Sequence, residues 1–258
     1  MIPAPRQRLA VVTGGSSGIG LATASSLLDQ GYKVAFFGQR RDRVTEAEQM
    51  LSARFGAENV FARTVDLAKP VQIQRFFHAL ERKWAMPDIL VSNAGISPKG
   101  ESGATPFAQI TANEWHWVLA VNLTGAMRCC QAVLPHMMEH RFGRIVFVSS
   151  IAGRTIPKIS GAAYATSKSA LAGLARSLVA ASAGHGTTVN IVAPGRIATE
   201  MAGAPDSEAN RAALARIPVG RIGMPEDVAA AICFLVSEGA EFINGAVLDV
   251  NGGEFAPL

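Results

Sequence analysis

LAVVTGGSSGIGLATASSLLDQG, residues 9–31, combines a short apolar run, a glycine-rich turn and a helical pattern. The turn places Gly14, Gly18 and Gly20 directly after the apolar run. The first N–H groups of a helix have no partner within it, and glycines let an anion approach them closely. The spacing is GxxxGxG and not the GxGxxG of the dinucleotide fingerprint. We still interpret this strand, turn and helix as a pyrophosphate-binding site, with a plain tight turn as the alternative.

The alternation of apolar runs and helical patterns continues along the whole chain. The runs are short and apolar throughout, which is typical of parallel strands that are covered on both faces. We predict strands at 9–13, 33–37, 58–65, 88–92, 144–149, 188–192 and 246–250. Because helical stretches separate them, the sequence predicts an α/β fold. It is a single-domain, doubly wound parallel sheet of the Rossmann type over residues 1–258, with helices on both faces.

A polar, alanine-rich segment, MAGAPDSEANRAALARI at 201–217, interrupts this pattern after the sixth predicted strand. In open α/β sheets, ligands bind beyond the carboxyl ends of the strands. The segment is therefore placed to act as a substrate lid, and a surface excursion without function is the alternative.

The end of the second predicted strand, in FFGQRRDR, bears on the choice of cofactor. An acidic side chain there would hold the ribose 2′-hydroxyl of NAD, whereas basic side chains accept the 2′-phosphate of NADP. Gly38 stands in the expected place, Arg40 and Arg41 follow, and Asp42 comes too late, in the next helix. This favours NADP(H), with NAD(H) as the second choice. The alternative interpretation is that both arginines are only the solvated start of a helix.

Tyr164 is one of two tyrosines in the chain and precedes Lys168 by four residues. The surrounding pattern predicts a helix between Gly161 and Gly184, which makes the two side chains neighbours on one face. A tyrosine hydroxyl titrates near ~10, and an ammonium ~5 Å away would lower that pKa by roughly two units. We therefore predict that the pair exchanges a proton with a substrate oxygen. A buried polar pair that the fold tolerates is the alternative.

Two further polar residues stand where the same site could use them. Ser150 ends the fifth predicted strand, so its hydroxyl is expected at the carboxyl edge of the sheet. Asn122 falls inside a long helical pattern, where asparagine is a poor helix former. It could hold a water molecule or loosen the helix locally. Each residue alone would be an ordinary structural feature.

Composition excludes several other classes of function. The net charge of +4 comes from scattered arginines with no basic stripe among aromatic residues, which argues against nucleic-acid binding. Cys129, Cys130 and Cys233 form no metal-binding pattern, and we expect reduced thiols in a cytoplasmic protein. The N-terminal MIPAPRQRLA is not expected to be a signal peptide, and no apolar run reaches the ~18 residues of a membrane span.

The motifs, taken in order, are TGGSSGIG (13–20), DL (66–67), NAG (93–95), Asn122, SS (149–150), YATSK (164–168), PGRIAT (194–199) and LDVNGG (248–253). With this set the chain resembles the classical subgroup of the short-chain dehydrogenase/reductase family along nearly its whole length. The resemblance implies an NAD(P)-dependent oxidoreductase in which hydride transfer is the chemistry of the cofactor. It also implies a homotetramer, with a dimer as the alternative.

The resemblance assigns roles to individual residues. Ser150 polarises the substrate carbonyl and Tyr164 gives or takes the proton. Lys168 lowers the pKa of Tyr164 and binds the nicotinamide ribose, and Asn122 anchors a water of a proton relay. The cofactor-binding set that it implies, together with the strand-end residues above, is Gly14, Ser16, Ser17, Gly18, Ile19, Gly20, Gly38, Arg40, Arg41, Asp66, Leu67, Asn93, Ala94, Gly95, Tyr164, Lys168, Pro194, Gly195, Ile197 and Thr199.

Within the family, the chain is most similar to the 3-oxoacyl-[acyl-carrier-protein] reductases, which makes acyl carrier protein a candidate partner. Two basic positions thought to dock the carrier fall on Arg141, which matches, and on His185, which is mostly neutral near pH 7. Gln39 and the polar loop 96–111 also depart from that pattern. A reductase of a small ketone, ketose or secondary alcohol therefore remains an alternative. A dinucleotide-binding sensor without catalysis is a more distant one.

Overall fold

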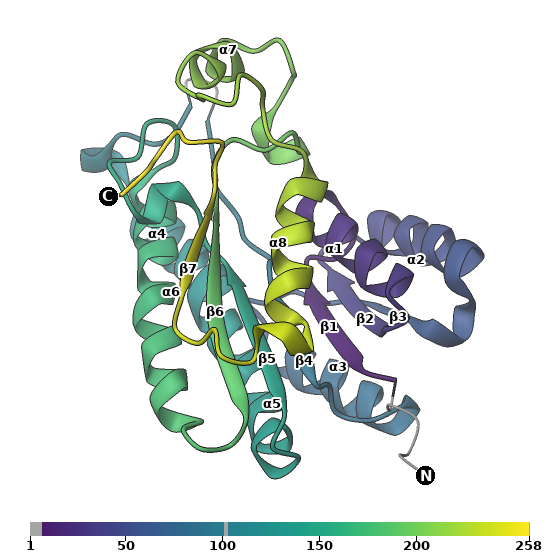
Figure 1. The fold of residues 1–258 in the computed structure, drawn as a ribbon. Coiled ribbons are helices and arrows are strands. Elements are labelled where there is room, and N and C mark those ends of the chain that lie inside the picture. The colour runs from purple at the N-terminus through teal and green to yellow at the C-terminus, as the bar shows by residue number, and fades with distance from the viewer. Residues whose placement is uncertain (1–6, 101–102, 258) are drawn as a thin grey trace.

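The computed structural model describes residues 7–100 and 103–257, which contain a sheet of seven parallel strands (Figure 1). The strands are β1 (Leu9–Thr13), β2 (Lys33–Gly38), β3 (Val60–Thr64), β4 (Ile89–Ser92), β5 (Gly143–Val148), β6 (Thr187–Pro194) and β7 (Val247–Val250). Each predicted strand is found to within two residues. The third one starts late because Ala57–Asn59 form a 3-10 turn before it.

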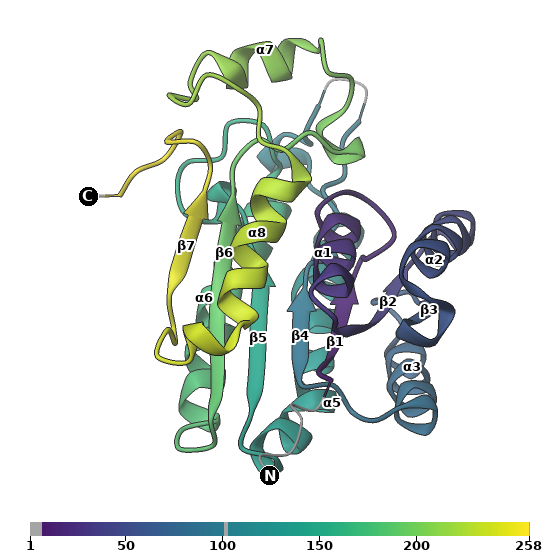
Figure 2. The same cartoon turned by 45° about the vertical axis from the view of Figure 1, so that its right-hand side comes forward.

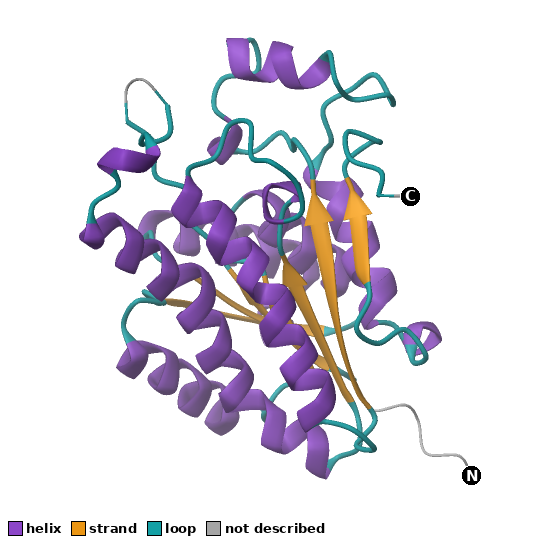
Figure 3. Cartoon of the chain, turned by 90° about the vertical axis from the view of Figure 1, so that its left-hand side faces the viewer, coloured by secondary structure: helices purple, strands orange, loops and turns teal. Residues whose placement is uncertain are grey.

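Helices cover both faces of this sheet, as predicted (Figure 3). They are α1 (Gly18–Asp29), α2 (Arg41–Phe55), α3 (Pro70–Lys83), α4 (Ala112–Leu119), α5 (Ala126–Glu139), α6 (Ala162–Ala181), α7 (Glu208–Leu214) and α8 (Pro225–Val236). Successive strand residues face opposite sides, so Val11 packs in one core with α3, α5 and α6, and Val12 packs in the other with α1, α2 and α8. Apolar side chains on both faces explain why the strands are apolar throughout.

The strand order β3-β2-β1-β4-β5-β6-β7 reverses direction between β1 and β4. In a doubly wound sheet, ligands bind in the crevice at such a switch point, outside the carboxyl ends of the strands. Because all strands run parallel, the segments that follow β1, β2, β4, β5 and β6 meet at this one edge. Figure 2 shows α7 lying above it, and with the 3-10 turn η5 (Glu200–Ala202) this helix makes up most of the predicted lid segment.

A continuous helical stretch, Ala112–Glu139, links α4 to α5 through a π-helical turn, η3 (Ala120–Gly125). Of the residues that the structure describes, only this stretch is long and apolar enough to cross a membrane by length and composition. Its Cys129, Val133 and Met137 side chains are fully buried against the sheet. This is the packing of a core helix.

Candidate active site

The turn after β1 is held by polar contacts to the segment after β4. The Thr13 hydroxyl accepts hydrogen bonds from the backbone N–H groups of Asn93, at 3.0 Å, and of Ala94, at 2.9 Å. The Asn93 side-chain amide donates to the Thr13 carbonyl at 3.0 Å. These contacts fix the glycine-rich turn relative to the switch point. Asn93 and Ala94 thus support the predicted cofactor site from below.

The glycines of this turn are required by its geometry. Gly14 and Gly18 have φ of +66° and +51°, a conformation that other residues adopt at a cost. A Cβ atom on Gly20 would lie 2.1 Å from the Gly14 carbonyl oxygen, so Gly20 lets α1 pack onto the turn. Ser17 precedes α1 without capping it through its side chain, which leaves the first N–H groups of the helix to a ligand. The turn therefore fits a dinucleotide pyrophosphate.

Ser150, Tyr164 and Lys168 come together where β5 ends against α6. The Lys168 Nζ atom donates to the Val148 carbonyl at 2.7 Å, and the Ser149 hydroxyl donates to the Lys168 carbonyl at 2.9 Å. The Ser150 hydroxyl accepts from the Ala152 N–H at 3.1 Å, and Ser150 lies close enough to Tyr164 to act on the pKa of its phenol. Strand and helix thus fix all three predicted catalytic side chains relative to one another.

Burial dominates the electrostatics of this cluster. It raises the pKa of Tyr164, against a smaller lowering by the hydrogen bond from Ser150, and it lowers the pKa of Lys168 to about 8. The Nζ atom lies 5.7 Å from the centre of the Tyr164 ring and points to the Val148 carbonyl. Desolvation is thus the largest effect on the phenol in this structure, and the lowering of the Tyr164 pKa by Lys168 stays a prediction.

Asn122 lies in the π-helical turn, so the helix is locally distorted there, as its position suggested. The side chain is buried, accepts from the Ile96 N–H at 2.8 Å, and donates to the Ile96 carbonyl and the Ser167 hydroxyl, both at 3.0 Å. It thus joins α6 to the segment after β4. Its side chain is committed to these partners, and its role with a relay water remains a prediction.

A cavity of about 610 Å³ opens at the carboxyl edge of the sheet, within the usual size range of ligand sites. The predicted residues that line it are Gly14, Ser16, Ser17, Gly18, Ile19, Gly38, Arg40, Asp66, Leu67, Asn93, Ala94, Gly95, Ser150, Tyr164, Lys168, Pro194, Gly195, Ile197 and Thr199. Three predicted residues do not line it. Gly20 and Asn122 lie beneath its wall, and Arg41 is exposed at the start of α2.

The basic wall of the cavity is formed by Arg40 and Arg43 and not by Arg41. Helix α2 starts at Arg41, and residues three apart near a helix start share one face. The three-residue spacing of Arg40 and Arg43 is the sequence signal that indicates Arg43. The prediction from the strand end did not include this residue. Gly38 lets the two turns approach, since a Cβ atom there would lie 2.4 Å from the Ser16 hydroxyl.

The cavity is also lined by Ile96, Ser97 and Lys99 after β4 and by Met201 and Arg216 of the predicted lid segment, where we expect the substrate. Residues 101–102 of the loop predicted at 96–111 lie outside the described part. The Arg196 guanidinium holds the segment 201–217 in place, because it donates to the Asn210 side chain at 2.7 Å and to the Ala202 carbonyl at 2.6 Å.

The two positions considered for carrier docking lie side by side, but not at this edge. The Arg141 guanidinium donates to the Gly184 carbonyl at 3.0 Å, next to His185. Both residues directly precede strands, β5 and β6, and therefore lie at the amino-terminal edge of the sheet. Ser150 and Tyr164 of the same chain lie at the opposite edge.

The fold and the site together define a dinucleotide-dependent oxidoreductase. The family model described as "Enoyl-(Acyl carrier protein) reductase" matches residues 14–254. The chain is 35% identical to the 3-oxoacyl-[acyl-carrier-protein] reductase FabG of Vibrio cholerae, covering 96% of this chain and 97% of that protein. It is 38% identical to the 3-oxoacyl-[acyl-carrier-protein] reductase MabA of Mycobacterium bovis, covering 95% and 92%.

A crystal structure of a 3-oxoacyl-[acyl-carrier protein] reductase from Brucella melitensis with bound NAD superposes with a TM-score of 0.88. That protein is 32% identical, and the match covers 98% of this chain and 94% of the other. The chain belongs to the short-chain dehydrogenase/reductase family. It is an NAD(P)-dependent enzyme that acts on CH–OH and C=O groups, as the resemblance implied.

Proposed function

We propose that this chain is an NADP(H)-dependent reductase of 3-oxoacyl thioesters. The observation that supports the proposal is the half-buried Tyr164 side chain, which lies next to Ser150 and lines the cavity together with the glycine-rich turn. The names of the relatives support the thioester, and the two arginines on the cavity wall support the 2′-phosphate.

Some residues of the site would bind the cofactor and others would transfer the proton. Bound NADPH would supply the hydride, and the turn at Gly14–Gly20 would hold its pyrophosphate. Ser150 would donate a hydrogen bond to the substrate carbonyl oxygen, and Tyr164 would protonate the same oxygen as negative charge develops there. Lys168 would stabilise the phenolate left behind. A raised phenol pKa keeps Tyr164 protonated at neutral pH, which suits the reductive direction.

The substrate side favours an acyl thioester over a ketose. Ile156 and Met201 line the cavity and are exposed apolar side chains, which suit an acyl chain. Lys99 and Lys158 line it as well and would attract the phosphate of a thioester-bearing arm. A polyol would instead call for several paired hydrogen-bonding side chains.

Initial rates with NADPH on an acetoacetyl thioester, a crotonyl thioester and a small ketone or ketose test this proposal. Acetoacetyl thioester should be reduced at least tenfold more efficiently than a small ketone or ketose, and a crotonyl thioester should not be reduced. Turnover on the small ketone or ketose alone would indicate a reductase of small ketones, ketoses or secondary alcohols. Turnover on the crotonyl thioester would indicate reduction of a C=C bond.

Arg43→Ala should raise the KM for NADPH about tenfold or more, since a guanidinium–phosphate contact is a charge-assisted hydrogen bond. The KM for NADH should change less than twofold. Arg41→Ala is the matched control, because Arg41 is exposed and does not line the cavity, and it should leave both values unchanged. Equal effects of the two variants would contradict the assignment of the 2′-phosphate to Arg43.

We also infer a cytoplasmic homotetramer for which acyl carrier protein is a partner. The small-residue composition of α6 supports close helix packing between subunits. Since Arg141 lies at the edge away from Tyr164 of the same chain, a carrier bound there would serve another subunit. Arg141→Glu should then slow reduction of a carrier-bound substrate but not of a small thioester. If the Arg141→Glu variant reduced both substrates as fast as the wild type does, Arg141 would not belong to the carrier-binding site.

A further inference from the structure

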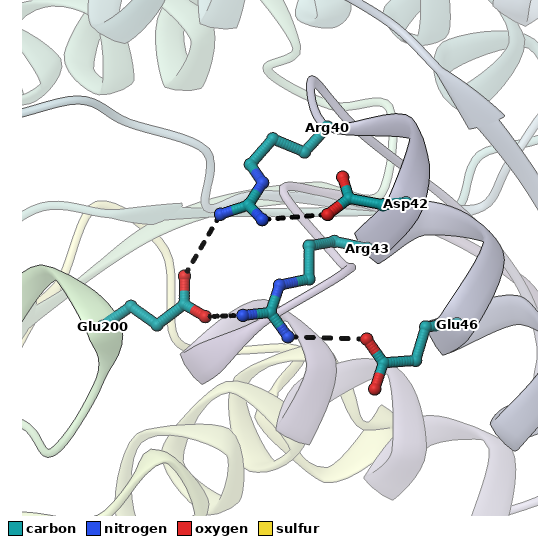
Figure 4. A network of polar contacts seen from close by, with 5 residues as sticks. All are labelled: Arg40, Asp42, Arg43, Glu46 and Glu200. Carbon is teal, nitrogen blue, oxygen red and sulfur yellow. Dashed lines mark hydrogen bonds and ion pairs between the residues drawn. The ribbon is translucent and has the colours of Figure 1, made fainter.

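Two arginines and three carboxylates form a cluster at the adenosine end of the cavity (Figure 4). The Arg40 guanidinium pairs with Asp42 at 2.9 Å and approaches Glu200 at 4.0 Å. The Arg43 guanidinium pairs with Glu46 at 3.4 Å and also with Glu200. Each arginine thus faces two carboxylates, and Glu200 is the carboxylate that both share.

Glu200 differs from the other two carboxylates in where it is attached. Asp42 and Glu46 belong to α2, the helix that follows Arg40 and carries Arg43. Glu200 comes from 157 residues further along than Arg43 and starts the 3-10 turn that leads from β6 into α7. Its pairs with the arginines therefore join the lid segment to the cofactor side of the cleft.

We propose that Glu200 is a latch that occupies the place of the cofactor 2′-phosphate on Arg40 and Arg43. Binding of NADP(H) displaces this carboxylate and releases the start of the lid segment, whereas NAD(H) leaves the latch closed. The inference rests on the proposed NADP(H) dependence and extends it. It makes Glu200 a residue that determines how the enzyme responds to the phosphate.

The charge of the cluster requires such a displacement. Three carboxylates against two guanidiniums leave a net negative charge around the arginines. A phosphate monoester brings a further −1.5 to −2 at neutral pH, by the general value of ~6 for its second pKa. It binds well only where a carboxylate leaves. Asp42 and Glu46 lie in the same helix as Arg43, so only the departure of Glu200 separates two segments that are distant in the chain.

The consequence reaches the substrate side through the next two residues. Met201 and Ala202 follow Glu200 directly and line the cavity. The Ala202 carbonyl is held by Arg196, which also holds Asn210 in α7. Release of Glu200 thus detaches residues 200–201 from α2, while Arg196 still holds Ala202 and α7. Binding of the cofactor 2′-phosphate would therefore change the cavity wall on the side where we expect the substrate.

Glu200→Gln separates this latch from a simple effect of charge when it is compared with Glu46→Gln. Both changes remove one negative charge beside Arg43, but Glu46 lies on α2 and cannot hold the lid. Both variants should bind NADP+ about two- to fivefold more tightly than the wild type, the range expected for exposed ion pairs, and NAD+ unchanged. Isothermal titration calorimetry measures both.

Hydrogen exchange of residues 200–203, whose amides bond within the turn that Glu200 starts, gives the deciding readout, with adenosine 2′,5′-bisphosphate and AMP as probes. In the wild type and in the control variant Glu46→Gln, the bisphosphate should speed exchange in this segment. AMP should not. In Glu200→Gln, exchange should already be fast and should not respond. Wild-type protein that binds the bisphosphate tightly without a change in exchange overturns the latch alone. Wild-type protein that binds it no better than AMP overturns the NADP(H) assignment and the latch with it.

Discussion

Tyr164→Phe should lower kcat for ketone reduction about a thousandfold, within the range that general acid catalysis contributes. The change removes one oxygen, the only proton donor that we assign to the substrate. Cofactor affinity should stay within about threefold, because the ring and the Lys168 ammonium remain in place. Stopped-flow oxidation of NADPH measures the chemical step, and fluorescence titration measures binding.

Tyr32→Phe is the matched control for this experiment, since Tyr32 is the other tyrosine of the chain and does not line the cavity. It should retain wild-type turnover. A Tyr164→Phe enzyme with turnover within tenfold of the wild type would refute the proton-donor role. Loss of both turnover and cofactor binding would mean that the substitution disturbs the site and does not report on the proton.

Lys168→Met should lower kcat at least a hundredfold and yet stabilise the folded protein at pH 7. The unfolded lysine titrates near ~10.4, and burial lowers the folded pKa to about 8. The folded state therefore pays roughly 3 kcal/mol at pH 7 to keep this ammonium protonated. Removing it leaves the Val148 carbonyl without its donor, at a cost of about 1–2 kcal/mol. A net gain of roughly 1–2 kcal/mol remains.

This gain should vanish with rising pH. Between the folded pKa of about 8 and the unfolded value of ~10.4, the unfolded chain still binds a proton that the folded protein has lost. The wild type is therefore stabilised over this window relative to the variant, and at pH 10 the penalty falls below about 1 kcal/mol. Urea unfolding at pH 7 and pH 10 without dinucleotide measures the difference. A variant less stable than the wild type at pH 7 would show that Lys168 carries no such penalty.

Much of the fold and of the catalytic cluster followed from the sequence. Parallel strands bring their carboxyl ends to one edge, so Gly14, Ser150 and Thr199 meet there although they are far apart in the chain. The i, i+4 spacing correctly made Tyr164 and Lys168 neighbours. These predictions depend on backbone periodicity and topology, which apolar patterns report well.

Other features depend on side-chain directions, which the patterns do not report. The Lys168 ammonium turns toward the Val148 carbonyl, and the depth of burial then decides the Tyr164 pKa. Arg43 reaches the cavity only because α2 starts where it does. The contact of Glu200 with Arg43 joins segments 157 residues apart, and no local signal in the sequence indicates it.

Transfer of hydride to a carbonyl carbon is tested most directly by following a deuterium label from the cofactor to the product. The enzyme is given acetoacetyl thioester and NADPH that carries deuterium at both C4 positions, and the product is examined by mass spectrometry and NMR. We expect a 3-hydroxyacyl thioester with one deuterium on C3, the carbon that bears the new hydroxyl group. A product without deuterium at C3, or a saturated product labelled in its chain, would contradict transfer of hydride to a carbonyl that Tyr164 protonates.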